Sequence, residues 1–151
     1  MSEHGAPVVV ERRIAASPAT VFSFFSDATR WLGWQGVEAE IELEPGGVFR
    51  MNVRGDGFAS GTVIEVVPDR RLVFTWGWEE ESLGVPPGST VVEIELEPEG
   101  DGTVLRLTHR DLPAGAMEIH RAGWVHYLSR LAVSAAGGDP GPDPARVSPR
   151  T

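Results

Sequence analysis

Apolar and polar residues alternate in six short segments between residues 37 and 110, and turn residues separate the segments. The clearest examples are residues 37–43 and 90–97, in which aliphatic residues alternate with glutamates. A period of two is typical of a strand with one buried face and one solvated face. Strands joined by tight turns such as Pro45-Gly46-Gly47 must pair antiparallel, so these segments predict a run of hairpins.

Elements of other kinds flank the hairpins. Ser17 is a good helix N-cap and Pro18 suits the first helical position, so two short helices are expected over residues 18–32. From Ala114 the apolar period changes from two to about 3.6, which predicts a helix over 114–136. The remaining expected elements are strands, at residues 7–15, 48–54, 58–67, 71–78 and 103–110.

The widths of these elements predict a hollow. One helix is about 10–12 Å wide, whereas six or seven strands spaced about 4.8 Å apart form a much wider layer. The sheet should therefore curl around the C-terminal helix to cover its apolar face. We expect an α+β fold in which a seven-stranded curved antiparallel sheet surrounds that helix and encloses a cavity.

The candidate cavity residues are mostly aromatic. Five tryptophans are many for 151 residues. Any single one could simply fill the core, but buried indole N–H groups need polar partners, which a ligand or water could supply. The candidate lining residues are Trp31, Trp34, Phe49, Met51, Phe58, Phe74, Trp76, Trp78, His109, His120, Trp124, Tyr127 and Leu128.

Three of these residues are candidates for catalysis: His109, His120 and Tyr127. His109 shares a strand face with Leu105 and Leu107, and we favour a structural role for it, bonded to a backbone carbonyl or to Asp111. His120 and Tyr127 are two helical turns apart and lie on one side of the last helix. No metal site is predicted, because His120 and His126 lie on different helix faces, and no cofactor is predicted.

Composition excludes several classes of partner. The net charge of −9 disfavours nucleic acids and anionic membranes. No apolar run is long enough to insert across a membrane. The chain has no cysteine and no recognisable leader, so we expect a cytoplasmic protein.

Several motifs resemble one superfamily. They are VERRIAASPATVF at residues 10–22, WLGW at 31–34, PGGVFR at 45–50, GTVIEVVPDRRLVFTW at 61–76, LTHRDL at 107–112 and GWVHYLSRL at 123–131. In this order they resemble the START-like (SRPBCC) superfamily, and within it the bacterial homologues of the activator of heat-shock chaperone ATPase. The resemblance implies a helix-grip fold around a hydrophobic pocket. We expect this domain at residues 1–136, and a disordered Pro-rich tail at 137–151.

The resemblance leaves the activity open, because members of the superfamily include carriers and enzymes. The eukaryotic chaperone activators carry an additional domain for which this chain has no room, so direct chaperone binding is not expected. We favour binding of a small hydrophobic or amphipathic ligand, without catalysis. One alternative is a cyclase, dehydratase or hydrolase that acts on an aromatic or polyketide-like substrate. Another is a regulatory or stress-related interaction domain, for example a homodimer through the outer sheet face or through residues 79–89.

Overall fold

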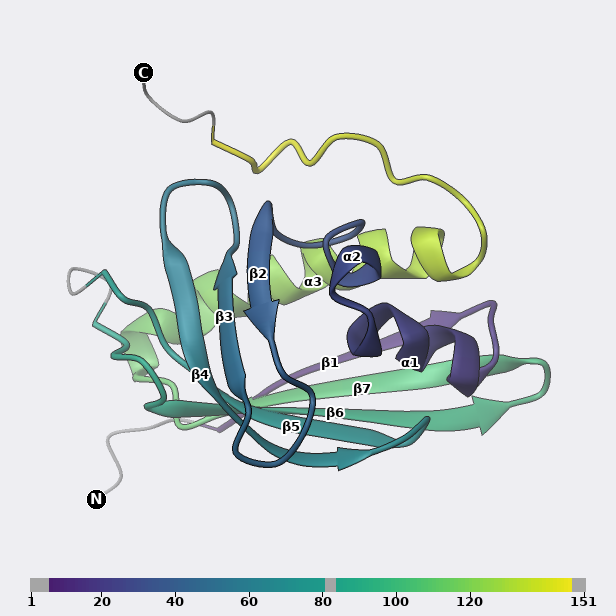
Figure 1. The fold of residues 1–151 in the computed structure, drawn as a ribbon, viewed down its shortest axis with the longest axis horizontal. Coiled ribbons are helices and arrows are strands. Elements are labelled where there is room, and N and C mark those ends of the chain that lie inside the picture. Colours follow the sequence, from purple (N-terminus) through teal and green to yellow (C-terminus); the bar gives the residue numbers. More distant parts are fainter. Residues whose placement is uncertain (1–5, 81–83, 148–151) are drawn as a thin grey trace.

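Seven antiparallel strands form one curved sheet that lies around the long helix α3, Met117–Ala135 (Figure 1). The structure is a computed structural model that describes residues 6–80 and 84–147. The sheet order is β1-β7-β6-β5-β4-β3-β2, which confirms the expected α+β fold. The other elements are β1 (Val8–Ile14), α1 (Pro18–Ser26), α2 (Ala28–Trp31), β2 (Glu38–Ile41), β3 (Val48–Asn52), β4 (Phe58–Val67), β5 (Arg71–Trp76), β6 (Thr90–Glu99), β7 (Gly102–Arg110) and the 3₁₀ turn η2 (Ala114–Ala116).

Side-chain caps fix the two short helices where the sequence predicts them. The Ser17 hydroxyl accepts a hydrogen bond from the Thr20 N–H at 3.2 Å, and Pro18 occupies the first turn of α1. The Asp27 carboxylate accepts the Thr29 N–H at 2.9 Å and begins α2. Because these caps satisfy backbone donors at both helix starts, α1 and α2 form despite their short length.

Strand β4 departs from the simple alternation. The pattern predicts that Ile64 lies on the same face as Thr62 and Val66, opposite Glu65. Instead Val63 is buried, Ile64 is 49% exposed, and the pairing with β5 shifts between Val63 and Glu65. A β-bulge of this kind places an extra residue in one strand and reverses the faces beyond it.

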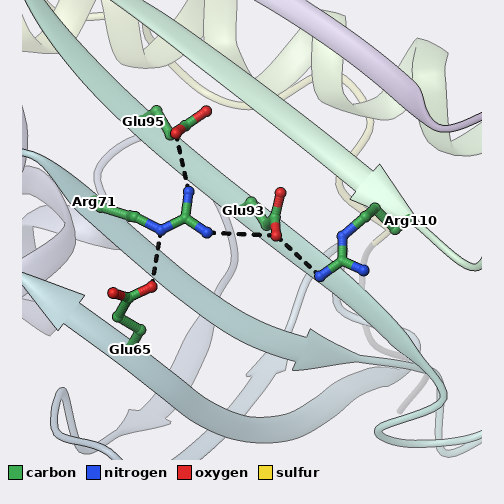
Figure 2. A network of polar contacts seen from close by, with 5 residues as sticks. All are labelled: Glu65, Arg71, Glu93, Glu95 and Arg110. Atoms are coloured by element: carbon green, nitrogen blue, oxygen red, sulfur yellow. Dashed lines mark hydrogen bonds and ion pairs between the residues drawn. The ribbon is translucent and has the colours of Figure 1, made fainter.

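Ion pairs cover the outer face of the sheet (Figure 2). The Arg71 guanidinium contacts Glu65 at 2.8 Å, Glu95 at 3.0 Å and Glu93 at 3.5 Å. Arg110 shares the Glu93 carboxylate at 2.9 Å. These charged side chains come from four neighbouring strands, β4 to β7, so this face is solvated and the apolar face is turned toward α3.

Residues 137–147, for which a disordered tail is expected, make several polar contacts with the domain. The Asp143 carboxylate accepts hydrogen bonds from the Tyr127 hydroxyl at 2.8 Å and from His126 Nε2 at 2.7 Å. Arg130 donates to the Gly141 carbonyl at 2.9 Å, and the Val147 N–H donates to the Arg54 carbonyl at 2.6 Å. The segment thus crosses from the end of α3 to the β3–β4 turn (Figure 1). A few polar anchors hold a chain segment that has almost no apolar side chains of its own.

Replacing Asp143 with asparagine should release this segment. The change weakens two hydrogen bonds to a carboxylate, and such bonds contribute about 1.5–3 kcal/mol each where they are well formed. We expect trypsin to cleave after Arg146 several times faster in the variant. Asp139→Asn is the matched control, because the Asp139 carboxylate caps only the Gly141 N–H within the same segment. Equal cleavage rates in the two variants would show that Asp143 does not anchor the tail.

Candidate functional site

Helix α3 lies nearest to β1, at one edge of the sheet, and reaches the strands farther across mainly through its side chains. Its buried residues recur every three or four positions and form one face. They are Trp124, Tyr127, Leu128, Leu131 and Ala135. The interior between this face and strands β3–β5 is therefore filled by side chains, most of them large and aromatic.

One group of rings fills the end of this interior nearest α1 and α2. Trp31 and Trp34 stack with ring centroids 5.8 Å apart, and Phe25 meets both rings edge-on. Phe49 and Phe74, from β3 and β5, lie 4.4 Å apart and contact Trp31. All five side chains are almost completely buried, so this group belongs to the packed core.

A second group, here called the indole–imidazole cluster, consists of Trp76, Trp78, His109, His120 and Trp124. Trp76 ends β5 and lies 5.3 Å from Trp124 and 6.0 Å from His109. The His109 and His120 rings are 5.3 Å apart. The sheet register brings the end of β5, the start of β6 and the end of β7 to one place, and α3 supplies the remaining rings.

Hydrogen bonds define the tautomers of both histidines in this cluster. An indole N–H can only donate, so His109 Nδ1 accepts from Trp124 Nε1 at 3.0 Å. His109 Nε2 therefore carries the proton and donates to Thr90 Oγ1 at 2.8 Å, and the Thr90 hydroxyl donates to the Trp76 carbonyl at 2.7 Å. Likewise His120 Nε2 accepts from Trp78 Nε1 at 3.0 Å, and its Nδ1 donates to the Ala116 carbonyl at 2.8 Å.

Burial keeps both imidazoles neutral. His109 is fully buried, and this burial lowers its pKa to about 3, with the neighbouring His120 acting in the same direction. Burial also lowers the pKa of His120, although the hydrogen bond to the Ala116 carbonyl opposes the shift. All four ring nitrogens are engaged in hydrogen bonds, so neither histidine has a ring nitrogen left to accept a proton from a substrate.

Phe58 does not join the other predicted site residues, and Tyr127 joins them only through its ring, which belongs to the same core. Phe58 lies on the outer face of β4, where the Arg50 guanidinium sits 3.7 Å above its ring. The next residue, Ala59, is fully buried and faces inward, and consecutive residues of a strand point to opposite faces. Tyr127 is buried, but its hydroxyl turns toward Asp143 in the tail, away from His109 and His120. Burial and this hydrogen bond together raise the pKa of Tyr127.

The remaining candidates share one core on the inner side of the sheet. They are Trp31, Trp34, Phe49, Met51, Phe74, Trp76, Trp78, His109, His120, Trp124 and Leu128. His109 is a satisfied core histidine, but its partners are Thr90 and Trp124, where a backbone carbonyl or Asp111 was expected.

Sequence reasoning missed two polar residues of the interior. Thr90 begins β6 and links His109 to the Trp76 backbone, and Gln35 accepts the Trp31 indole N–H at 2.9 Å. Nothing in the alternation distinguishes Thr90 from other strand threonines. Its role follows only from the register that pairs it with Trp76.

Two further features were candidates for a site away from this interior: a hollow on the surface, and groups of side chains that could bind a metal ion. An open, shallow hollow lies beside the charged outer sheet face, where Arg71, Glu95 and Arg106 contribute to its wall. The enclosed hydrophobic cavity between α3 and the sheet stays a prediction. Within residues 6–80 and 84–147, no group of three or more His, Asp or Glu side chains is arranged to hold a metal ion. No helix in the same ranges is long and apolar enough to cross a membrane.

Comparisons with known proteins agree with the fold. An AHSA1-like protein from Rhizobium etli has a solution structure with 48% identity and a TM-score of 0.70, and the match covers 96% of this chain and 92% of that one. The crystal structure of DynU16, described as a protein of the dynemicin biosynthetic locus, matches with 25% identity and a TM-score of 0.78. That match covers 95% of this chain and 50% of DynU16.

A human relative extends the family beyond bacteria. The activator of 90 kDa heat shock protein ATPase homolog 1 from Homo sapiens is 25% identical over 123 residues. The match covers 80% of this chain but only 34% of the human protein. The family model described as "Activator of Hsp90 ATPase homolog 1-like protein" matches residues 15–136, which is most of the chain. The protein therefore belongs to the Activator of Hsp90 ATPase homolog 1-like family.

Proposed function

We propose that this protein binds a small, mostly apolar molecule between α3 and the inner face of strands β3–β5. The proposal rests on the kind of side chains that fill this space. Helix α3 stays close to β1, and large side chains, many of them aromatic, bridge the distance to the far strands. Rings that pack at tilted and edge-on angles can give up some of their mutual contacts and make similar contacts with an apolar ligand.

The alternatives have less support. Catalysis by His109 and His120 would need at least one of their four engaged ring nitrogens to leave its present partner. Tyr127 lies outside their reach, bonded to the tail. A protein-interaction role through the outer sheet face would have to displace the ion pairs around Arg71 (Figure 2). Ligand binding requires neither change.

A titration tests the proposal directly. Fatty acids, sterols and polycyclic aromatic compounds are added to the full chain while tryptophan fluorescence and the melting temperature are recorded. We expect at least one apolar class to change the emission and to raise the melting temperature. Free ligand at 100 times its Kd stabilises the folded state by about 2.7 kcal/mol.

Two variants of α3 locate the binding region. Leu128→Phe adds bulk to the buried face, whereas Val125→Phe adds even more bulk to a side chain that is 48% exposed. We expect the first change to weaken binding by about tenfold or more, at a stability cost of about 1–3 kcal/mol, and the second to leave affinity unchanged. Equal affinities in both variants would place the ligand elsewhere, and a panel without any binder would refute the proposal.

A further inference from the structure

The Trp76 indole is the exception among the five tryptophans. Trp31, Trp34, Trp78 and Trp124 each donate their N–H to an acceptor within the protein. Trp76 is only 2% exposed, yet its Nε1 has no acceptor among the described residues. Buried indole N–H groups nearly always have a partner, so this donor marks a place where an acceptor belongs.

The two imidazoles of the cluster cannot supply that acceptor without losing a bond of their own. His109 Nδ1 is occupied by the Trp124 N–H, and His120 Nε2 by the Trp78 N–H. The indole–imidazole cluster therefore presents one donor and no unoccupied ring acceptor. Such a site selects a molecule that brings a hydrogen-bond acceptor with it.

The charge of the cluster limits the ligand further. Its three indoles carry no charge, and its two imidazoles hold one proton each through the hydrogen bonds to Thr90 and Ala116. A carboxylate or ammonium group placed among these rings would be buried beside neutral partners only, which is unfavourable. The acceptor should therefore belong to an uncharged group.

The shape of the surroundings favours a flat ligand. The ring centroids of Trp124, Trp78, Phe49 and Phe74 lie 5.3, 5.4, 5.8 and 6.4 Å from that of Trp76. The planes of these four rings are inclined to the Trp76 ring by between 35° and 85°. Aromatic edges and faces on several sides are the surroundings in which another planar ring packs well.

We infer that Trp76 Nε1 is the recognition donor of the proposed site, and that the site takes an uncharged, planar ring compound with a carbonyl, ether or hydroxyl oxygen. The inference rests on the proposed function and specifies its ligand class. The aromatic side chains around Trp76 must move apart to admit the ring system, whose oxygen then accepts the Trp76 N–H.

Three related compounds test the inference by calorimetry on the full chain. 9-Fluorenone has the acceptor, fluorene has the same ring system without it, and fluorene-9-carboxylate is charged. We expect fluorenone to bind about tenfold more tightly than fluorene, which corresponds to one hydrogen bond. The carboxylate should bind at least as weakly as fluorene.

Matched variants assign the preference to one indole. Trp76→Phe should bring the two affinities within about twofold of each other while fluorene still binds, because a ring remains and the donor is lost. Trp34→Phe is the control, since the Trp34 N–H already donates to the Phe24 carbonyl at 3.2 Å. This control should keep the tenfold preference.

If the Trp76→Phe variant does not fold, NMR spectroscopy of the wild-type protein provides the test instead. In ¹⁵N-labelled wild-type protein, fluorenone should move one indole N–H resonance downfield and fluorene should not. Equal binding of fluorene and fluorenone, or an unmoved indole resonance, would overturn the inference and leave the proposed function intact. A preference that persists in Trp76→Phe would also overturn it. Failure of both neutral compounds to bind would also overturn the inference, whereas the proposed function would fall only if the fatty acids and sterols of the wider panel failed as well.

Discussion

Replacing Phe74 with alanine should lower the free energy of unfolding by about 3–5 kcal/mol, the usual cost of removing a buried phenyl ring. Phe74 is fully buried in the centre of β5 and contacts Phe49, Trp31 and Trp76. Three rings, from α2, β3 and β5 itself, would lose contacts at once, and the rigid strands around them limit collapse into the hole. Urea denaturation followed by far-UV circular dichroism measures the change.

The matched control is Phe58→Ala, one strand away. The Phe58 ring lies under the Arg50 guanidinium on the outer face, where such a contact contributes about 0.5–1 kcal/mol. We expect a loss of about 1 kcal/mol. If the two substitutions cost the same, the assignment of Phe74 to the core and of Phe58 to the outer face is wrong.

The second large effect is a loss of stability on mild acidification. In the folded protein burial lowers the pKa of His109 to about 3, whereas in the unfolded chain its pKa is about 6.5. The unfolded chain therefore binds this proton first as the pH falls. The stability due to the neutral imidazole is fully present above about pH 6.5 and is lost progressively between pH 6.5 and pH 3. Between pH 7 and pH 5 His109 alone should cost about 2 kcal/mol, and His120 shifts in the same direction.

Urea denaturation at pH 7, 6 and 5 checks this prediction with two variants. His109→Gln should be less stable at pH 7, because it breaks bonds to Thr90 and Trp124, but should lose about 2 kcal/mol less than wild type on acidification to pH 5. Thr90→Val removes one of those bonds and keeps the titrating ring, so its loss on acidification should match wild type. An unchanged loss in His109→Gln would refute the account.

The architecture follows closely from local patterns. Alternation between tight turns, together with the Ser17 and Asp27 caps, places every strand and helix within a few residues of where it lies. These features are local, so they can be read one segment at a time. The bulge at Val63 and Glu65 could not be read in this way, because an extra residue in β4 depends on its pairing with β5.

The site could be predicted less completely. Burial of His109 follows from the strand face that it shares with Leu105 and Leu107. Its bond to Thr90 depends on register across three strands, and the orientation of Tyr127 depends on a tail whose composition indicates disorder. Side-chain partners that are distant in sequence are set by tertiary packing, and one-dimensional patterns carry no record of them.

The bonds from Trp124 through His109 and Thr90 to the Trp76 carbonyl run from α3 across β7 and β6 to β5. Together with the Trp78–His120 bond they form a clamp between one side of the helix and the sheet, because Trp124 and His120 both belong to α3. Any widening of the interior must therefore pivot about this clamp and open at the opposite rim, between the β3–β4 hairpin and the C-terminal half of α3. The tail is held at this rim by the hydrogen bonds of Asp143 and Val147, so these bonds must break before the rim can open.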